Sequence, residues 1–271
     1  MKTISLCILI FLTGCAIKEP VSVSITDDIP EFKIYDGQLN PEDYASYSSK
    51  KMAWGIGPDK NDQMIPYDCL NAEEDYHSLN GVFLASNQKE ILLTFDNGYE
   101  NGNTPAILDT LKKHDVKAMF FITSQYAKEN PELVERMINE GHTIGNHSWH
   151  HYSFTDISTE VLISEILSLH NYMIDHFQYS MTALRPPKGE FSERVLAVAK
   201  DLGYTTYLWS YAYYDYNVND QPDEAEAFNK LISNLHPGEI LLLHAVSDTN
   251  KNILDEFIDQ TLNKGYTFIT K

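Results

Sequence analysis

Cysteine is scarce in this chain of 271 residues, which contains only Cys7, Cys15 and Cys69. The first two fall in an N-terminal targeting segment, so Cys69 is left without an internal partner and a disulfide framework is excluded. Cys69 lies in a polar stretch without a nearby base. We therefore interpret it as a free thiol rather than as a nucleophile.

Basic residues are also few. The chain has 20 Lys and Arg against 39 Asp and Glu, a formal net charge of -19 at pH 7. A surface of this sign repels nucleic acid and anionic membrane faces, so we expect no nucleic-acid partner. Acidity alone identifies no substrate.

Beyond the N-terminus, no run of residues is long and apolar enough to span a bilayer. Residues 1–15 combine a basic Lys2 with an apolar stretch and the sequence LTGC at 12–15. LTGC looks like a bacterial lipobox, which predicts a lipoprotein signal peptide and a lipid on Cys15 that anchors the protein to a membrane of the cell envelope, outside the cytoplasm. An ordinary signal peptide with an incidental cysteine is the alternative.

Composition divides the rest of the chain into three parts. Residues 16–50 are polar and acidic with few large aliphatics, which predicts a flexible tether. Residues 51–89 contain too many turn formers for a long helix but include Trp54 and Tyr76, so we expect an N-terminal extension packed on the following domain. Residues 90–271 form that domain.

Strand-like and helix-like stretches alternate from residue 90 onwards. The expected strands are 91–95, 117–123, 143–144, 183–184, 205–209, 239–243 and 266–269, and the expected helices are 104–114, 131–140, 158–176, 192–202, 224–235 and 249–263. This alternation predicts an α/β fold with a parallel sheet and helices outside. About seven strand–helix units favour a barrel over an open sheet, although periodicity does not settle that choice.

The first expected strand ends in a carboxylate. Its apolar run ILLTF at 91–95 is followed by the breakers Asp96, Asn97 and Gly98. The carboxyl ends of buried parallel strands are where α/β proteins place chemistry. A turn Asp satisfied by local backbone amides is the alternative.

His147 and His151 are four residues apart in NHSWHH at 146–151. On a helical turn this spacing points both imidazoles to one side, as metal binding requires, while His150 points elsewhere. A cluster of surface histidines is the alternative.

Two further strand ends carry polar residues. Arg185 precedes Pro186 and Pro187, which fix the backbone, so its guanidinium can be aimed at a carboxylate and lower the pKa of that carboxylate. His244 follows the apolar run ILLL, and Asp215 could orient its imidazole. Each residue also has an ordinary structural interpretation, but in a barrel all these strand ends meet in one pocket.

Taken in order, TFDNG at 94–98, HSWHH at 147–151, RPP at 185–187 and LLH at 242–244 resemble the polysaccharide deacetylases of carbohydrate esterase family 4, the NodB-homology group. The resemblance covers about residues 90–271. It implies a distorted (β/α) barrel of about seven strands and metal-dependent removal of N- or O-acetyl groups from glycans.

One departure from the family pattern points to a branch. The usual first motif is TFDDG, whereas this chain has Asn97 at the second Asp. With TFDNGYENG at 94–102, RPPKG at 185–189 and WS at 209–210, the chain resembles the delta-lactam-forming muramic acid de-N-acetylases, which act on peptidoglycan glycan strands. Trp54 and Gly55 resemble that branch's N-terminal extension. The Asp-Trp of the fourth motif is here Asp215 and Tyr216.

The resemblance implies roles for the metal ligands and the base. His147 and His151 would hold a divalent metal, expected to be Zn²⁺, and Asn97 could add a neutral amide oxygen. Asp96 would take a proton from the attacking water, and Arg185 would keep Asp96 ionised.

The resemblance also implies the proton donor and the substrate contacts. His244 would protonate the leaving amine, and Asp215 would hold its imidazole. The expected substrate-binding residues are Tyr99, whose neighbourhood would supply an oxyanion N–H, and Pro186, Pro187 and Trp209.

Two alternatives to muramic acid de-N-acetylation stay open. One is a deacetylase of another N- or O-acetylated glycan, such as chitin oligomers. The other is a non-catalytic glycan-binding lipoprotein with a decayed metal site, which Asn97 favours and which Asp96 and His244 oppose. We expect a monomer in each case.

Overall fold

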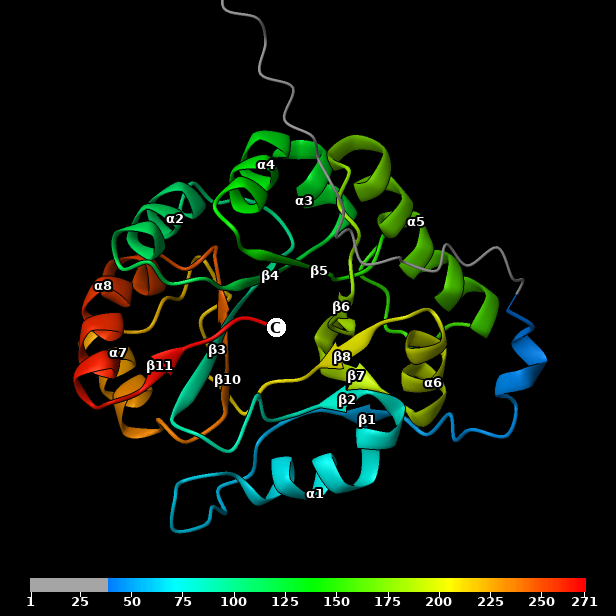
Figure 1. The fold of residues 1–271 in the computed structure, drawn as a ribbon, viewed down its shortest axis with the longest axis horizontal. Coiled ribbons are helices and arrows are strands. Elements are labelled where there is room, and N and C mark those ends of the chain that lie inside the picture. The colour runs from blue at the N-terminus through cyan, green and yellow to red at the C-terminus, as the bar shows by residue number, and fades with distance from the viewer. Residues whose placement is uncertain (1–38) are drawn as a thin grey trace, which may run out of the picture. The chain divides into compact units, whose positions relative to one another are not determined.

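The computed structural model describes residues 39–271 (Figure 1). The predicted signal peptide, the lipid on Cys15 and most of the predicted tether lie outside the described residues. Within residues 39–271, no helix has the length and apolar character needed to cross a membrane.

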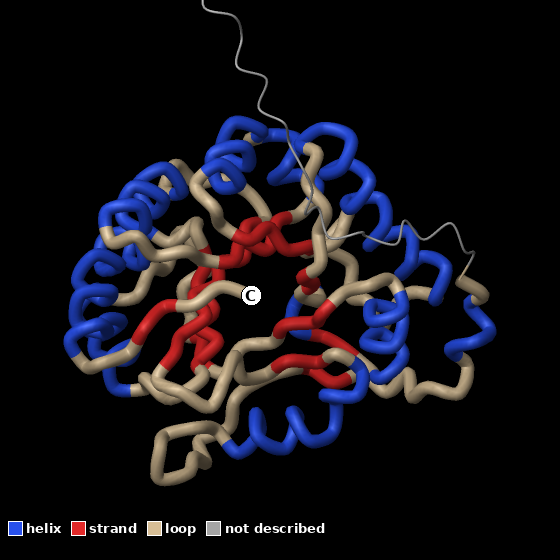
Figure 2. Tube along the Cα trace, viewed as in Figure 1, coloured by secondary structure: helices blue, strands red, loops and turns tan. Residues whose placement is uncertain are grey.

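Within the described chain, nine strands form one parallel sheet whose ends curl towards each other (Figures 1 and 2). Their order is β2 (Gly81–Val82), β8 (Thr205–Tyr207), β6 (Ala183–Leu184), β5 (Thr143–Asn146), β4 (Met119–Ile122), β3 (Glu90–Asn97), β10 (Glu239–His244) and β9 (Tyr211–Ala212), with β11 (Thr267–Phe268) beside the start of β3. Because β2 and β9 are not paired with each other in this part of the chain, the barrel is open between them.

The seven predicted strands are all present, and the predicted α/β barrel is confirmed in this distorted, open form. The sequence missed β2 and β9, which have two residues each. Strand β2 lies in the predicted extension, and β9 lies just beyond the predicted strand 205–209.

Seven helices of the described chain surround the sheet (Figure 2). They are α2 (Thr104–Lys113), α3 (Ser124–Glu129), α4 (Pro131–Asn139), α5 (Thr159–Phe177), α6 (Glu193–Asp201), α7 (Glu224–Ser233) and α8 (Asp248–Asn263). Ser192 caps the N-terminus of α6, because its hydroxyl accepts a hydrogen bond from the Val195 N–H at 3.3 Å. The sequence missed α3, a single polar helix of six residues.

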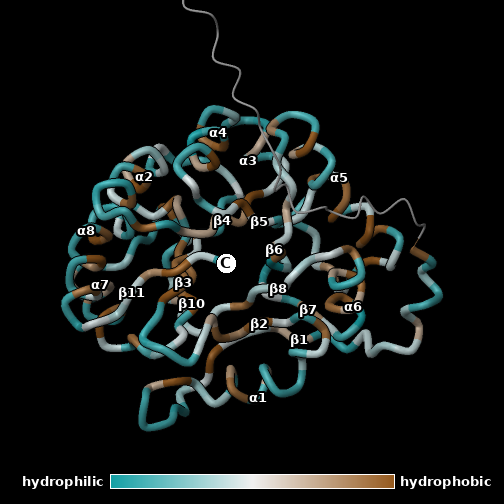
Figure 3. The backbone as a smooth tube through the Cα atoms, viewed as in Figure 1, coloured by the Kyte–Doolittle hydropathy of each residue, from teal (hydrophilic) through white to brown (hydrophobic). Residues whose placement is uncertain are grey.

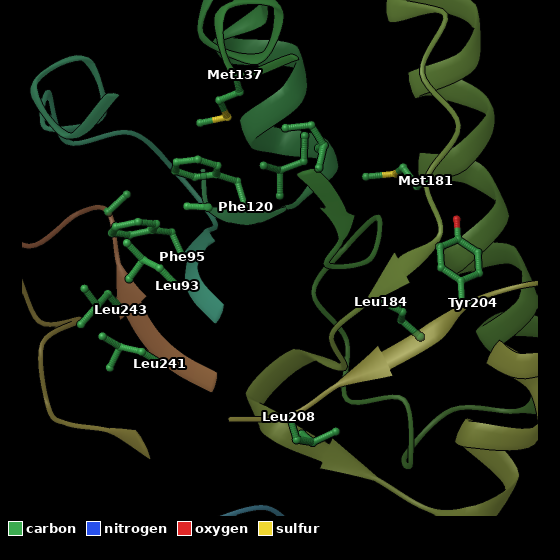
Figure 4. Packing of buried hydrophobic residues seen from close by; sticks show 14 of the residues in the cluster. Leu93, Phe95, Phe120, Met137, Met181, Leu184, Tyr204, Leu208, Leu241 and Leu243 are labelled. Atoms are coloured by element: carbon green, nitrogen blue, oxygen red, sulfur yellow. The ribbon is translucent and has the colours of Figure 1, made fainter. Parts of the chain in front are cut away.

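Buried apolar residues of the strands and helices form the core. Figure 3 shows hydrophobic segments along the strands and in the helices that surround them. Figure 4 shows Phe95 and Phe120 at the junction of β3 and β4, where their rings stack with centroids 5.1 Å apart. Leu93, Leu241 and Leu243 pack beside them from β3 and β10. Close packing on both sides holds the carboxyl ends of these strands in place.

The structure corrects the predicted tether at its C-terminal end. Pro41–Tyr44 forms a 3-10 helix, η1, whose Tyr44 is buried and donates to the Asp201 carboxylate at 2.9 Å. The Ser48 N–H donates to Glu193 at 3.0 Å. Residues 39–50 therefore pack on the barrel, because a buried tyrosine ties them to α6.

The extension at 51–89 also packs on the barrel. Strand β1 (Met52–Ala53) pairs antiparallel with β7 (Glu190–Phe191) in a separate two-stranded sheet. It is followed by α1 (Tyr67–Tyr76) and the 3-10 helix η2 (His77–Leu79), and then by β2, the edge strand of the main sheet. The extension thus contributes both a helix and a strand to the fold.

Candidate active site

A pocket of about 920 Å³ opens at the carboxyl ends of β3, β5 and β10. Its wall combines a carboxylate, several imidazoles and a set of aromatic rings. The lining residues are Asp96, Gly98, Tyr99, Thr123, Ser124, Gln125, His147, Trp149, His150, His151, Lys188, Gly189, Trp209, Ala212, Tyr213, Tyr216, Leu242, His244 and Val246.

Asp96 and Arg185 form a buried ion pair at the base of this pocket. Arg185 Nη1 lies 2.7 Å from Asp96 Oδ1, and the guanidinium also donates to Thr94 Oγ1 at 2.9 Å and to the Tyr207 carbonyl at 3.1 Å. Its face lies 4.1 Å from the centroid of the Phe121 ring. These contacts hold the guanidinium in one position, as predicted from its place before two prolines.

The ion pair keeps Asp96 ionised. Burial alone would raise the pKa of Asp96, but the positive charge of Arg185, with smaller effects from His147 and His244, holds that pKa below its ordinary value. A carboxylate that is buried yet charged can accept a proton from a bound water.

His147 and His151 face each other in the pocket, with ring centroids 4.9 Å apart. His147 Nδ1 lies 2.8 Å from the Arg185 carbonyl. Because a carbonyl can only accept, Nδ1 carries the proton, and Nε2 is left with a free lone pair, 3.6 Å from Asp96 Oδ2. Burial lowers the pKa of His147, and desolvation, followed by the nearby His147, lowers that of His151 to about 4. Both imidazoles are therefore neutral at pH 7, as metal ligands must be.

The pair does not rest on a helical turn, as the spacing suggested. Ser148 and His151 both have left-handed backbones, with φ of 74° and 60°. The His151 N–H donates to Ser148 Oγ at 2.8 Å, and the Ser148 N–H donates to Asn146 Oδ1 at 2.9 Å. A tight loop held by side-chain acceptors thus brings the imidazoles together. His150 does turn elsewhere, towards the Glu165 carboxylate of α5.

Asn97 is not placed as the predicted metal ligand. It is fully buried and is not among the residues that line the pocket. Side chains alternate along a strand, so when Asp96 faces the pocket Asn97 faces the other side of β3. There it lies near the Tyr126 hydroxyl, which donates to the Glu100 carboxylate and to Thr104. Within residues 39–271 neither polar atom of the Asn97 amide has a hydrogen-bond partner.

The residues present fit a divalent metal in part. His147 and His151 are neutral and converge. In the described chain, however, no three His, Cys, Asp or Glu side chains gather as a metal site. The donor set therefore fits a cation held by two imidazoles, without a third ligand from Asn97.

His244 and Asp215 form a second pair at the carboxyl end of β10, the strand next to β3. His244 Nδ1 lies 2.7 Å from Asp215 Oδ1, and the His244 backbone N–H donates to Oδ2 at 2.8 Å. Asn250 Nδ2 donates to the same Oδ2 at 2.6 Å. Burial would lower the pKa of His244, but Asp215 overcomes this effect and raises it. The imidazolium is thus favoured, as a general acid requires.

Strand register brings the two pairs together. Strands β3 and β10 are adjacent and parallel, and His244 is the register partner of Asp96. The base of one pair and the acid of the other are therefore at the same level of the sheet. This arrangement supplies a proton acceptor and a proton donor to a group bound between them.

Aromatic rings also line the pocket. Tyr99 and Tyr216 are 44% and 54% exposed, and Trp209 lines the same pocket. Exposed rings of this kind stack on the apolar faces of sugars. Pro186 and Pro187, which were predicted to bind substrate, are buried and do not line the pocket. They form the turn that presents Lys188 and Gly189 instead.

Sequence reasoning missed several residues of the site. Trp149 and Tyr213 line the pocket, and Asn250 supports Asp215 from α8. Lys188 also lines the pocket, and its place directly after Arg-Pro-Pro was a signal that could have found it. Asn250 had no signal, because only the fold brings α8 to the loop that carries Asp215.

A family model described as polysaccharide deacetylase matches residues 84–207 of the chain. The peptidoglycan-N-acetylmuramic acid deacetylase PdaA of Bacillus subtilis (strain 168) is 46% identical over 191 residues, which cover 69% of this chain and 72% of that protein.

Two solved structures share the fold. That of Bacillus subtilis PdaA, a family 4 carbohydrate esterase, has a TM-score of 0.77 at 38% identity and covers 82% of this chain and 95% of that one. A family 4 carbohydrate esterase from Bacillus anthracis has a TM-score of 0.68 at 38% identity and covers 83% of this chain and 95% of that one.

Proposed function

Because this chain belongs to the polysaccharide deacetylases of carbohydrate esterase family 4, hydrolases that act on amide bonds of polysaccharides, we propose that it removes N-acetyl groups from peptidoglycan, and in particular from muramic acid. The observation that carries this proposal is the pairing of Asp96 with Arg185 and of His244 with Asp215, with Asp96 and His244 side by side in one pocket. The name of the similar Bacillus subtilis PdaA supports the choice of muramic acid.

The two pairs divide the chemistry of amide hydrolysis between them. Asp96, kept ionised by Arg185, accepts a proton from the water that attacks the acetyl carbonyl carbon. The resulting tetrahedral oxyanion is stabilised by a backbone N–H near Tyr99. His244 then gives a proton to the nitrogen as the C–N bond breaks, which releases acetate and leaves an amine on the sugar. A positioned proton donor of this kind contributes about 10²–10⁴ to the rate.

His147 and His151 would hold a divalent cation, expected to be Zn²⁺, whose chemistry when bound is Lewis-acid polarisation of water and of the acetyl carbonyl. The hydrogen bond from His147 Nδ1 to the Arg185 carbonyl directs the other ring nitrogen into the pocket. The same arginine therefore aims the base through its side chain and one imidazole through its backbone.

The amine product of this reaction can take part in a further reaction on the same sugar. An amine freed on muramic acid lies next to the lactyl carboxylate of the same sugar. Loss of water between the two groups would give a delta-lactam, so we propose that the enzyme supplies the amine for that ring.

Peptidoglycan lies outside the cytoplasm, and the N-terminal sequence is consistent with that location. We propose that Cys15 is acylated and anchors the enzyme to a membrane of the cell envelope. Cys15→Ala should release the protein into the soluble fraction on cell fractionation. If the variant stays in the membrane fraction as wild type does, the anchor is not at Cys15.

Acetate release tests the proposed function. Purified peptidoglycan, with and without its stem peptides, and chitin oligomers are incubated with the protein before and after treatment with a chelator and re-addition of Zn²⁺. We expect acetate from peptidoglycan, with the new amine on muramic acid, and none from Asp96→Asn. If acetate were released from chitin oligomers and not from peptidoglycan, the substrate would be a neutral N-acetylated glycan instead of peptidoglycan.

A further inference from the structure

Lys188 has an uncommon backbone conformation for a lysine. It lies inside the 3-10 helix η3 (Pro187–Gly189) with φ 61° and ψ 8°, in the left-handed region. Gly189 follows with φ 65°. A side chain with a Cβ avoids this region unless its surroundings hold it there.

The surroundings of the turn do hold it. The Trp54 N–H donates to the Gly189 carbonyl at 3.0 Å, and Trp54 Nε1 donates to the Trp209 carbonyl at 2.8 Å. The Gly189 Cα lies so close to the indole of Trp209 that a Cβ there would come within 2.4 Å of the ring. The extension and the pocket wall thus clamp the turn from both sides, and the Cα of Lys188 is fixed at the pocket edge.

Lys188 is the only lysine or arginine among the described residues that line the pocket. It shares that lining with His147 and His151, so its charge lies in the same pocket as the predicted metal ligands. The chain as a whole has nearly twice as many acidic as basic residues. An exposed positive charge in the pocket is therefore opposite in sign to the net charge of the protein.

The acids near Lys188 already have partners. Asp96 pairs with Arg185, and Glu190 lies 3.2 Å from Lys51. Within residues 39–271, Lys188 itself makes no ion pair within 4.0 Å. Its side chain is exposed and its charge is uncompensated.

We propose that the Lys188 ammonium binds the carboxylate of an acidic N-acetylated sugar and so selects muramic acid over neutral N-acetyl sugars. The inference rests on the proposed function. In muramic acid the lactyl group is joined through an ether oxygen to the carbon next to the one that carries the acetamide, so the lactyl carboxylate lies close to the reacting group. A flexible ammonium in the same pocket can reach it as a point charge. Arg185 cannot, because it is fully buried and bonded to Asp96.

The test compares two Lys188 variants and one control variant with wild type on three glycans. The first glycan has muramic acid with free lactyl carboxylates after removal of the stem peptides. The second is the same glycan with those carboxylates converted to methylamides, and the third is a chitin oligomer. The variants are Lys188→Gln and Lys188→Arg, with Lys230→Gln as a matched control that removes a surface lysine paired with Glu226 on α7.

We expect Lys188→Gln to lower kcat/KM about tenfold on the free-carboxylate glycan, mainly through KM, which is the size of one charge-assisted hydrogen bond. On the methylamide and on chitin oligomers, kcat/KM of Lys188→Gln should stay within about twofold of wild type, as it should for Lys230→Gln on all three. Lys188→Arg should retain the preference, and added salt should weaken it.

Two results would overturn the inference. An equal loss on all three glycans would mean that Lys188 serves the chemistry or the fold, and no loss on the free carboxylate would mean that it binds nothing there.

Peptidoglycan with intact stem peptides is a further substrate, which distinguishes binding of a peptide carboxylate from binding of the lactyl carboxylate. If wild type releases no acetate at all, the proposed function fails. Binding of the free-carboxylate glycan by calorimetry, to wild type and to Lys188→Gln, then tests the inference by itself.

Discussion

Trp54 Nε1 donates to the carbonyl of Trp209 at 2.8 Å, across 155 residues of sequence. This hydrogen bond joins the N-terminal extension to the wall of the pocket. The Trp54 ring also packs on Phe83, with centroids 4.6 Å apart. The extension is thus part of the structure that shapes the pocket.

Removal of this hydrogen bond should disturb the pocket wall. Trp54→Phe keeps an aromatic ring but loses the indole N–H, so we expect about 1 kcal/mol less stability and a several-fold loss of kcat/KM. Thermal unfolding and acetate release measure the two effects. Tyr67→Phe, an exposed position of α1, is the control and should change neither. Unchanged catalysis by Trp54→Phe would show that the wall does not depend on the extension.

Loss of Arg185 should move the acid limb of the pH–rate profile. Asp96 works only when ionised, and Arg185 holds its pKa below the ordinary value. Arg185→Met leaves the effect of burial, which raises that pKa, so activity should disappear at a higher pH than in wild type as the pH falls. The buried carboxylate then lacks a partner, and stability should fall by about 3–5 kcal/mol. Arg185→Lys keeps a positive charge and should shift the acid limb of the pH–rate profile less. If the acid limb of Arg185→Met is not shifted, Arg185 does not lower the pKa of Asp96.

Loss of the Asp215 charge should move the basic limb in the opposite direction. His244 donates its proton only when charged, and Asp215 raises its pKa, so wild-type activity persists until the pH rises through that raised value. In Asp215→Asn the pKa of His244 falls, and activity should be lost at lower pH, with kcat at pH 8 reduced about 10²-fold. Asp220→Asn, an exposed acid of the same loop, is the control. A profile of Asp215→Asn that matches this control would contradict the pairing.

Metal binding should depend on two imidazoles of one loop and not on the third. His147→Ala and His151→Ala should each weaken Zn²⁺ binding at least about 10-fold, since each would remove one of two protein ligands. His150→Gln is the matched control, because His150 bonds to Glu165 instead. Calorimetry and metal analysis of the purified proteins measure the affinity. One equivalent of Zn²⁺ held as tightly without either imidazole would place the metal elsewhere.

The sequence by itself determined the strands that carry the chemistry and the residues at their ends. The apolar runs of β3 and β10 are long enough to be recognised, and Asp96 and His244 follow these runs directly, near the carboxyl ends of the two strands. The place of Arg185 before two prolines predicted a guanidinium held in a defined direction, where it could pair with a carboxylate. These features are local, so local patterns reveal them.

Only the tertiary structure decided the rest of the site. Asn97 is still part of β3, so its side chain lies on the opposite face of the strand from that of Asp96 and away from the pocket. The motif itself does not show which of the two residues faces the pocket. His147 and His151 meet through a left-handed loop rather than a helical turn. Trp54 and Asn250 reach the site from distant parts of the chain. Contacts across such separations depend on how the sheet curls and which helices cover it, and neither is encoded in the pattern of any single stretch.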